Sequence, residues 1–119
     1  MLFDTTQLAL ERAISGASQR HAALAANLAN VNTPGYQRVD VDFHSALQGA
    51  MAGDDPHREV GRAAFSPQRD GAAVSRADGN GVDADAESAK IAANALEQQA
   101  AVTVAQTRIA ILKSAMGVA

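Results

Sequence analysis

Residues 27–36 read Asn27-Leu28-Ala29-Asn30-Val31-Asn32-Thr33-Pro34-Gly35-Tyr36, and this junction separates two different hydrophobic patterns. Apolar residues recur at helical spacing before it and alternate at strand spacing after it. Asparagine tolerates the left-handed conformation that often ends a helix, and Pro34 forces Thr33 out of the helical region. Pro34 and Gly35 suit the two central positions of a type II turn. The junction therefore predicts a helix end followed by a sharp turn, with more sequence detail than a helix end needs.

Two long helices are predicted, one on each side of the middle of the chain. The first runs from about residue 5 to 31, and the second begins near Asp83 or Asp85 and stops near Gly117. Apolar residues in both follow alternating steps of four and three, which is a heptad seam. The first seam consists of Leu10, Ile14, Ala17, His21, Leu24, Leu28 and Val31, and the second of Ile91, Ala95, Gln98, Val102, Ala105, Ile109, Leu112 and Met116. These seams predict a mainly α fold whose long terminal helices pack as an antiparallel, coiled-coil-like pair, with their remaining faces against adjacent protomers.

The middle of the chain is predicted to be an irregular region with short β segments. Residues 39–43 alternate apolar and polar side chains like a strand, and apolar residues at 43, 47 and 51 allow a helical turn. Prolines, glycines and mixed charges from Gly53 to Gly81 predict a loop that is disordered in the isolated chain. Within it, a small hairpin would place Ala73-Val74-Ser75 and Val82 on either side of a turn at Asp78-Gly79. The chain thus divides into residues 1–35, 36–82 and 83–119, which form one structural unit.

Composition indicates a chain that gains stability from neighbours. Alanine makes up 28 of the 119 residues and aromatic residues only 3%, so few large side chains can be buried. At about 25 cal/mol per Å² of buried apolar surface, such a core has little to set against the entropy of the unfolded chain. We therefore expect a marginally stable monomer.

The same composition argues against several classes of function. The net charge is −3 without a basic stripe, so nucleic-acid binding is not expected. The chain has no cysteine, which excludes disulfides and thiolate chemistry. Neither a signal-peptide pattern nor a run of about 20 apolar residues is visible. We expect no cleaved secretory signal and no membrane-spanning segment.

Residues with catalytic or metal-binding potential have simpler explanations. His21 has no second histidine or acid at ligand spacing, so we interpret it as a partly buried polar residue that tunes the helix register. Asp40 and Asp42 share a strand face that we expect to be exposed. The acids from Asp83 to Glu87 are typical of a helix N-terminus, and their spacing does not match a calcium-binding loop. We predict no enzyme, no cofactor, no metal site and no small-molecule substrate.

Two motifs resemble those of bacterial flagellar rod and hook proteins. That family reads roughly Asn-x-Ala-Asn-x-x-Thr at the end of its N-terminal helix, which residues 27–33 match, and Pro34-Gly35-Tyr36 follows. A similar second run precedes the last helix and reads Asp78-Gly79-Asn80-Gly81-Val82-Asp83. The resemblance covers nearly the whole chain apart from residues 44–73. Leu28 departs from the more frequent isoleucine, and no aromatic residue accompanies residues 97–99.

The resemblance implies a structural, self-associating subunit of the flagellar basal-body rod. Such a subunit is exported by the flagellar type III apparatus without a cleaved signal peptide and polymerises through its terminal helices. The product is a hollow, torque-transmitting axle needed for motility. The implied partners are further copies of the chain, other rod proteins, the rod–MS-ring adaptor FliE and the export gate. The candidate interface residues are Asn27, Asn30, Asn32, Thr33, Pro34, Gly35 and Tyr36.

The residues themselves leave two alternatives open. The junction asparagines could serve only to cap the first helix, rather than to bond with neighbouring subunits. A soluble helical adaptor or regulatory protein that binds a partner helix would also explain both seams, although not the detail of the junction.

Overall fold

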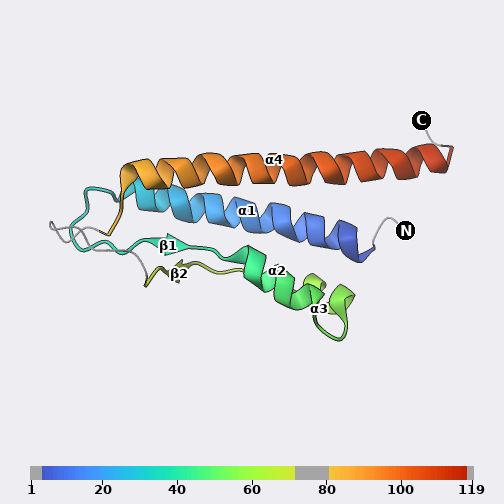
Figure 1. Cartoon of the computed structure of the whole chain (residues 1–119), viewed down its shortest axis with the longest axis horizontal. Coiled ribbons are helices and arrows are strands. Elements are labelled where there is room, and N and C mark those ends of the chain that lie inside the picture. The colour runs from blue at the N-terminus through green and yellow to red at the C-terminus, as the bar shows by residue number, and fades with distance from the viewer. Residues whose placement is uncertain (1–3, 72–80, 118–119) are drawn as a thin grey trace.

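The fold is built on two long antiparallel helices that lie side by side (Figure 1). The structure, a computed structural model, describes residues 4–71 and 81–117. The predicted pair of terminal helices is confirmed. Within the described ranges the elements in chain order are α1 (Thr5–Ala29), β1 (Val39–Asp40), α2 (Phe43–Met51), α3 (Pro56–Arg62), β2 (Gln68–Arg69) and α4 (Ala84–Ala115).

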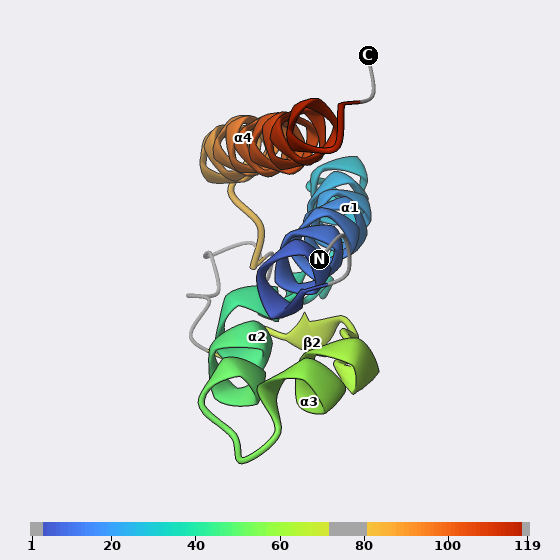
Figure 2. The ribbon, with the colours of Figure 1, turned by 90° about the vertical axis from the view of Figure 1, so that its right-hand side faces the viewer.

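The helices form three layers, with α1 in the middle. Viewed along the long axis, α4 lies on one side of α1, and α2 and α3 lie on the other (Figure 2). The helix α4 has 32 residues, which at 1.5 Å per residue gives a length of about 48 Å. Arg108 of α4 bonds to Asp4, at the start of α1, so the last turns of α4 extend past the end of α1. Consequently α1 is covered on two sides, whereas α4 packs mainly on one.

The junction forms the predicted sharp turn, but its asparagines act differently from expectation. The Tyr36 N–H donates to the Thr33 carbonyl at 3.2 Å, and Gly35 has a φ of 76°, as a type II turn requires. In the described ranges no residue other than glycine has positive φ, so the expectation of a left-handed asparagine is wrong. Asn30 instead caps α1 with its side chain, whose Nδ2 donates to the Ala26 carbonyl at 2.8 Å. The Ala26 carbonyl also accepts from the Asn30 N–H at 3.1 Å, so the side-chain amide adds a second bond that fixes the last turn of the helix.

Capping residues also define α4 at both ends. The Asp83 carboxylate accepts from the N–H groups of Asp85 at 3.0 Å and Ala86 at 3.3 Å. The helix ends at Ala115, and Gly117 follows with a φ of 74°. The predicted start and stop of the last helix are therefore confirmed.

The middle region is more ordered than the sequence suggested. Residues 56–62 form α3 within the stretch predicted to be a structureless loop, because Asp55 caps the helix and Pro56 opens it. The predicted strand is shorter than expected, and Asp42 starts α2 by accepting from the Ser45 N–H at 3.1 Å. The expected short β segments are present as an antiparallel pair that joins Val39 to Arg69 and Asp40 to Gln68. The expected hairpin around Asp78-Gly79 falls mostly outside the described residues.

A small apolar core joins α1 to the middle region. Ala17, Ala23, Val41 and Phe43 are buried together, and the Phe43 ring lies edge-on to Phe65 with ring centres 6.2 Å apart. Phe43 also lies directly over Gly16 of α1, where a Cβ atom would come within 2.5 Å of the ring carbon Cγ. Gly16 therefore permits the close approach of α2 to α1. Glycine normally weakens a helix, and the position of Phe43 explains its use here.

No helix in residues 4–71 and 81–117 combines the length and hydropathy needed to cross a bilayer.

Candidate functional site

Asn27 is the centre of the junction and is completely buried. Its Nδ2 donates to the Val39 carbonyl at 2.7 Å, and its Oδ1 accepts from the Val39 N–H at 2.9 Å. The side chain thereby engages both backbone groups of Val39, much as a neighbouring strand would. Nδ2 also donates to Glu87 at 3.1 Å, and the Tyr36 hydroxyl donates to Oδ1 at 3.3 Å. These four bonds use the full capacity of one amide, so Asn27 holds the extended segment against α1 from inside the chain.

Behind Asn27 lies a buried ion pair between Arg38 and Glu87. Arg38 Nε donates to Glu87 Oε1 at 2.6 Å, and the Glu87 side chain is 1% exposed. The guanidinium also bonds to Asp70 and, at 3.4 Å, to Asp40. These contacts join the start of α4 to the segments beside both strands, which are far apart in sequence.

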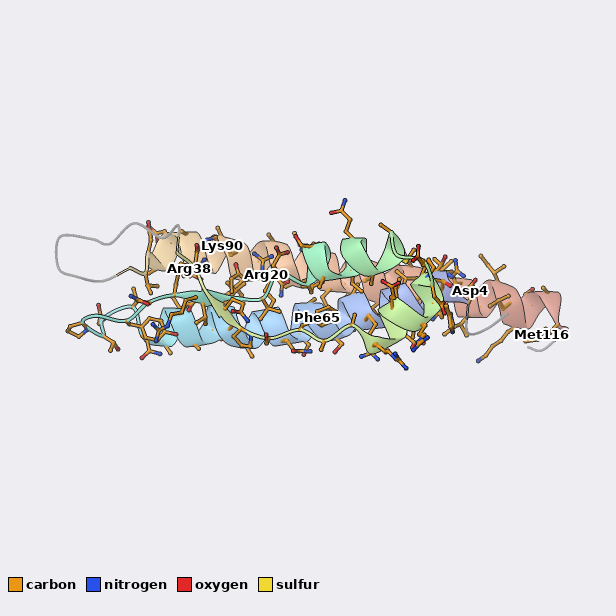
Figure 3. The ribbon with its side chains drawn as sticks, turned by 90° about the horizontal axis from the view of Figure 1, so that it is seen from below. Asp4, Arg20, Arg38, Phe65, Lys90 and Met116 are labelled. Atoms are coloured by element: carbon orange, nitrogen blue, oxygen red, sulfur yellow. The ribbon has the colours of Figure 1, made fainter. Side chains whose placement is uncertain are left out.

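Arg20 of α1 completes this network, which we call the junction network and define as Asn27, Arg20, Arg38, Asp40, Asp70 and Glu87. Arg20 binds Asp40 through two bonds, from Nε at 2.8 Å and from Nη2 at 3.2 Å. Arg20 and Arg38 lie where the extended segment crosses the long helices (Figure 3). The network therefore connects α1, β1 and α4 through charge-assisted hydrogen bonds.

The electrostatics of the junction network favour its charged form. Burial alone lowers the pKa of the Arg38 guanidinium, but its bonds to Glu87 and Asp70 outweigh burial and raise that pKa above the ordinary value. Burial likewise raises the pKa of Asp40, but the bonds from Arg20 and the Val41 N–H hold it below its usual range. Mutual pairing therefore compensates for the partial loss of water around these charges.

Two expectations about acidic residues are corrected by this network. Glu87 is buried rather than being only a surface acid of the first helical turn, and Asp40 is half-buried rather than exposed. The sequence held no signal for either pair, since Glu87 lies 49 positions from Arg38 and Asp40 lies 20 from Arg20. Charge pairs at such separations depend on the path of the chain.

The outer side of the junction consists of small polar groups. Asn30 is half-buried, and its Oδ1 accepts from the Thr33 hydroxyl at 3.1 Å. Residues 32–35 are exposed, whereas Tyr36 is half-buried. The seven candidate interface residues therefore fall into two groups, with Asn27 and Tyr36 turned inward and the others on or near the surface.

Most of the predicted seam residues lie at the contact between α1 and α4, but near Ala95 the contact face of α4 is shifted by one residue. The Leu24 side chain is buried, and Leu10, Ile14, Leu28, Ile91, Val102, Ile109 and Leu112 are half-buried. His21 is exposed, so its interpretation as a partly buried seam residue is wrong. Ala95 and Met116 are also exposed, and Asn94 is buried in place of Ala95. A hydrogen bond from Asn94 to α1 explains why a polar residue occupies that position.

The solvent-facing side of α4 also carries large apolar side chains. We call Leu96, Val104 and Ile111 the outer stripe, and they are 74%, 49% and 61% exposed. Their spacing of eight and seven residues corresponds to about two helical turns, which places them along one side of α4. The helix thus has an apolar face toward α1 and another toward solvent. In the described ranges α1 has no large apolar residue of comparable exposure, because α4, α2 and α3 cover it.

A hollow of about 340 Å³ adjoins the junction network. Its charged lining includes Arg20, Asp40 and Asp70, which the ion pairs of the network already engage. Residues 4–71 and 81–117 contain no group of three or more side chains arranged to hold a metal ion.

Comparison with known proteins relates this chain to flagellar rods. A family described as "Flagella basal body rod protein" matches residues 8–37, which span most of α1 and the junction. The chain is 35% identical over 112 residues to the flagellar basal body rod protein FlgB of Salmonella typhimurium, covering 79% of this chain and 80% of that protein. It is also 35% identical over 105 residues to FlgB of Escherichia coli K12, covering 75% and 76% of the two chains. A shorter match to FlgB of Yersinia ruckeri is 46% identical over 41 residues.

Proposed function

The chain belongs to the family of flagellar basal body rod proteins FlgB, and we propose that it polymerises through the outer stripe of α4 and the exposed side of the junction. As a family member it is a structural subunit of the bacterial flagellar basal-body rod, where it associates with other rod components. Its role is therefore mechanical and serves motility. In this proposal residues 1–35 and 83–119 supply the helix pair, and residues 36–82 supply the elements that cover α1.

The exposed outer stripe is the observation that carries the proposed mode of assembly. Burying one exposed leucine, valine or isoleucine side chain in an interface would contribute about 1.5–3 kcal/mol. A helix with apolar residues on two sides is expected to be covered on both. One face of α4 meets α1, so the other is available for a neighbouring subunit. Contacts between different surfaces of identical copies build an open helical array, which suits a hollow rod.

We further propose that the chain reaches the rod in a largely unfolded state through the flagellar type III export apparatus, without a cleaved signal peptide. The alanine-rich composition supports this step, because a chain with few large buried side chains is easily unfolded. The terminal helices would then order on docking, where neighbours supply the missing apolar contacts. The proposed neighbours are other copies, other rod proteins, the rod–MS-ring adaptor FliE and the export gate.

Glutamate substitutions at Val104 and Ile111 test the outer stripe. Both side chains are exposed, so we expect the purified double variant to change in unfolding free energy by no more than about 0.5 kcal/mol per site. Rod assembly should be lost, because a subunit interface would bury two unpaired charges. Basal bodies from a strain lacking the chromosomal copy would be imaged by electron microscopy, and swimming measured in soft agar.

Gln106→Glu is the matched control, because Gln106 is exposed on the same helix but lies outside the outer stripe. It should leave rods and swimming unchanged. Detection of the double variant in the culture medium would show that export still occurs. Normal rods in the double variant would contradict assembly through the outer stripe. A stable, discrete dimer of the purified chain that persists in this variant would favour the helical adaptor instead.

Asn30→Ala tests the exposed side of the junction. The side chain makes two local bonds, so its loss should change the stability of the isolated chain by only about 1 kcal/mol. We expect rod formation and swimming to be impaired if neighbouring subunits bond to this amide. Gln37→Ala, at an exposed position just beyond the junction, is the control and should swim normally. Normal swimming and normal rods in Asn30→Ala would remove the junction from the interface.

A further inference from the structure

We propose that Asn94 fixes the register of the α1–α4 pair, so that the two long helices meet in one alignment rather than in several. This role does not depend on the place of the protein in the rod. It concerns how an alanine-rich helix pair selects one of its alignments.

The apolar seams alone do not define one alignment. Residues that repeat every seven positions meet similar neighbours when one helix slides by a heptad, a shift of about 10 Å. Leu10, Ala17 and Leu24 occupy equivalent positions of α1, and Ala105 and Leu112 stand one heptad apart on α4. Alanine at the contact allows close packing but discriminates poorly between alignments. A polar residue inside the seam discriminates far better, because its partner must lie opposite it.

Asn94 has the burial and the partner that such a role requires. It is 1% exposed, and its Nδ2 donates to the main-chain carbonyl of Ala17 at 2.8 Å. Ala17 is itself 1% exposed, so the bond is enclosed between the helices. In the described ranges Asn94 Oδ1 has no hydrogen-bond partner. A buried amide with one unpaired atom costs stability, so this position is explained better by specificity than by strength.

Residue size restricts Asn94 to this alignment. Ala17 lets α4 come close enough for Asn94 to reach the main-chain carbonyl, because the alanine side chain is a single methyl group. A slide of one heptad in either direction would put Leu10 or Leu24 opposite Asn94. The larger leucine side chains would hold α4 further from α1 and leave the whole amide buried without a bond. The pairing of asparagine with alanine thus makes the native alignment the favourable one.

Other hydrogen bonds and ion pairs between α1 and α4 fit the same alignment, but they are weaker or lie at the ends of the helix pair. Gln98 Nε2 reaches the Ile14 carbonyl at 3.5 Å, which is a long bond. Arg108 binds Asp4 at 2.7 Å where both are partly exposed, and exposed ion pairs contribute little. Asn27 meets Glu87 within the junction network at the other end. Asn94 is the one amide of this set that is buried midway along the pair.

Cysteine pairs in the full chain would measure the alignment, since the chain has no native cysteine. The bond between Ile14 and Gln98 places Leu10 opposite Val102 one turn further on. The pair Leu10→Cys with Val102→Cys therefore reports the native alignment. Leu10→Cys with Ile109→Cys, which lies one heptad further along the α1-facing side of α4, reports a slide of one heptad. Mild oxidation followed by gel analysis gives the ratio of shifted to native cross-linking.

Asn94→Leu should raise this ratio about tenfold relative to the parent chain. The substitution removes the bond that favours the native alignment and also removes the cost of burying an unbonded amide in the shifted ones, which together correspond to about a tenfold preference. Its melting temperature should stay the same or rise, a result that a purely stabilising Asn94 would not produce. Asn94→Ala also removes the amide, and it provides the same test if leucine does not fit. Gln99→Leu makes the same amide-to-leucine change on an exposed position of α4 and should leave the ratio unchanged.

Two results would overturn the proposal. One is a parent chain that cross-links equally well in native and shifted pairs, which would mean that no register is selected. The other is an unchanged ratio in both Asn94 variants, which would assign the register to the ends of the helix pair.

Discussion

Replacing Glu87 with alanine is expected to destabilise the protein by about 3 kcal/mol, the lower end of the range for breaking a buried ion pair. Glu87 is 1% exposed and bonds to both Arg38 and Asn27. Its loss leaves the Arg38 guanidinium buried with less compensation and leaves an Asn27 donor without one acceptor. Asp40 and Asp70 still contact Arg38, which is why the loss stays near 3 kcal/mol. Urea unfolding followed by circular dichroism would measure it.

Two further variants separate the buried charge from simple loss of packing. Asp85→Ala removes an exposed acid from the same helical turn and should change the stability by no more than about 0.5 kcal/mol. The double variant Arg38→Met with Glu87→Met removes both charges and should be more stable than Glu87→Ala, since an apolar pair often replaces a buried ion pair at little cost. A Glu87→Ala chain as stable as Asp85→Ala would show that the pair contributes nothing.

The second large effect is expected at Gly16, where alanine should destabilise the protein despite its better helix propensity. A Cβ atom there would lie 2.5 Å from Phe43 Cγ and 2.6 Å from Phe43 Cβ. Real atoms do not approach so closely, so either Phe43 or the backbone of α2 must move. Such overpacking costs about 1–3 kcal/mol, against a gain in helix propensity of at most about 1 kcal/mol. Thermal unfolding of Gly16→Ala should therefore show a lower melting temperature.

Gly49→Ala is the matched control, since it makes the same change inside a helix of the same protein. Apart from its chain neighbours and the adjoining backbone of α2, no atom lies within 4 Å of the Cβ position at Gly49. Only helix propensity then acts, and the substitution should stabilise the chain by about 0.5–1 kcal/mol. The two alanine variants are thus expected to shift stability in opposite directions. A stabilised Gly16→Ala chain would show that Phe43 does not pack against α1 as the structure has it.

Both effects concern how the middle region attaches to α1, and this attachment determines which surface remains for assembly. Phe43 packs on one side of α1, and the junction network ties the extended segment to it. With α4 on its other side, α1 has little apolar surface left. The outer stripe of α4 is then the largest set of exposed apolar side chains along either long helix. The proposed assembly surface follows from this arrangement.

Sequence reasoning succeeded where the signal was local. The helix ends at Asp83 and Gly117 and the turn at Pro34-Gly35 depend on capping groups and backbone preferences within a few residues. It failed at α3, where Asp55 and Pro56 are a start signal that prolines and glycines nearby obscured. The apolar periodicity also places Ala95 on the α4 seam, where Asn94 is the buried residue. An apolar periodicity cannot reveal a buried polar residue whose partner lies on another helix.

The sequence by itself determined two long helices, their antiparallel pairing, the turn between helix and strand, and the resemblance to flagellar rod proteins. All of these rest on periodicity, caps and short motifs, which act over a few residues. Only the tertiary structure decided that Asn27 holds the strand, that Glu87 is buried against Arg38, and that Gly16 receives Phe43. These contacts join residues 12 to 49 positions apart, and the last of them requires close approach between helices. Their energies depend on burial, which exists only once the layers have packed.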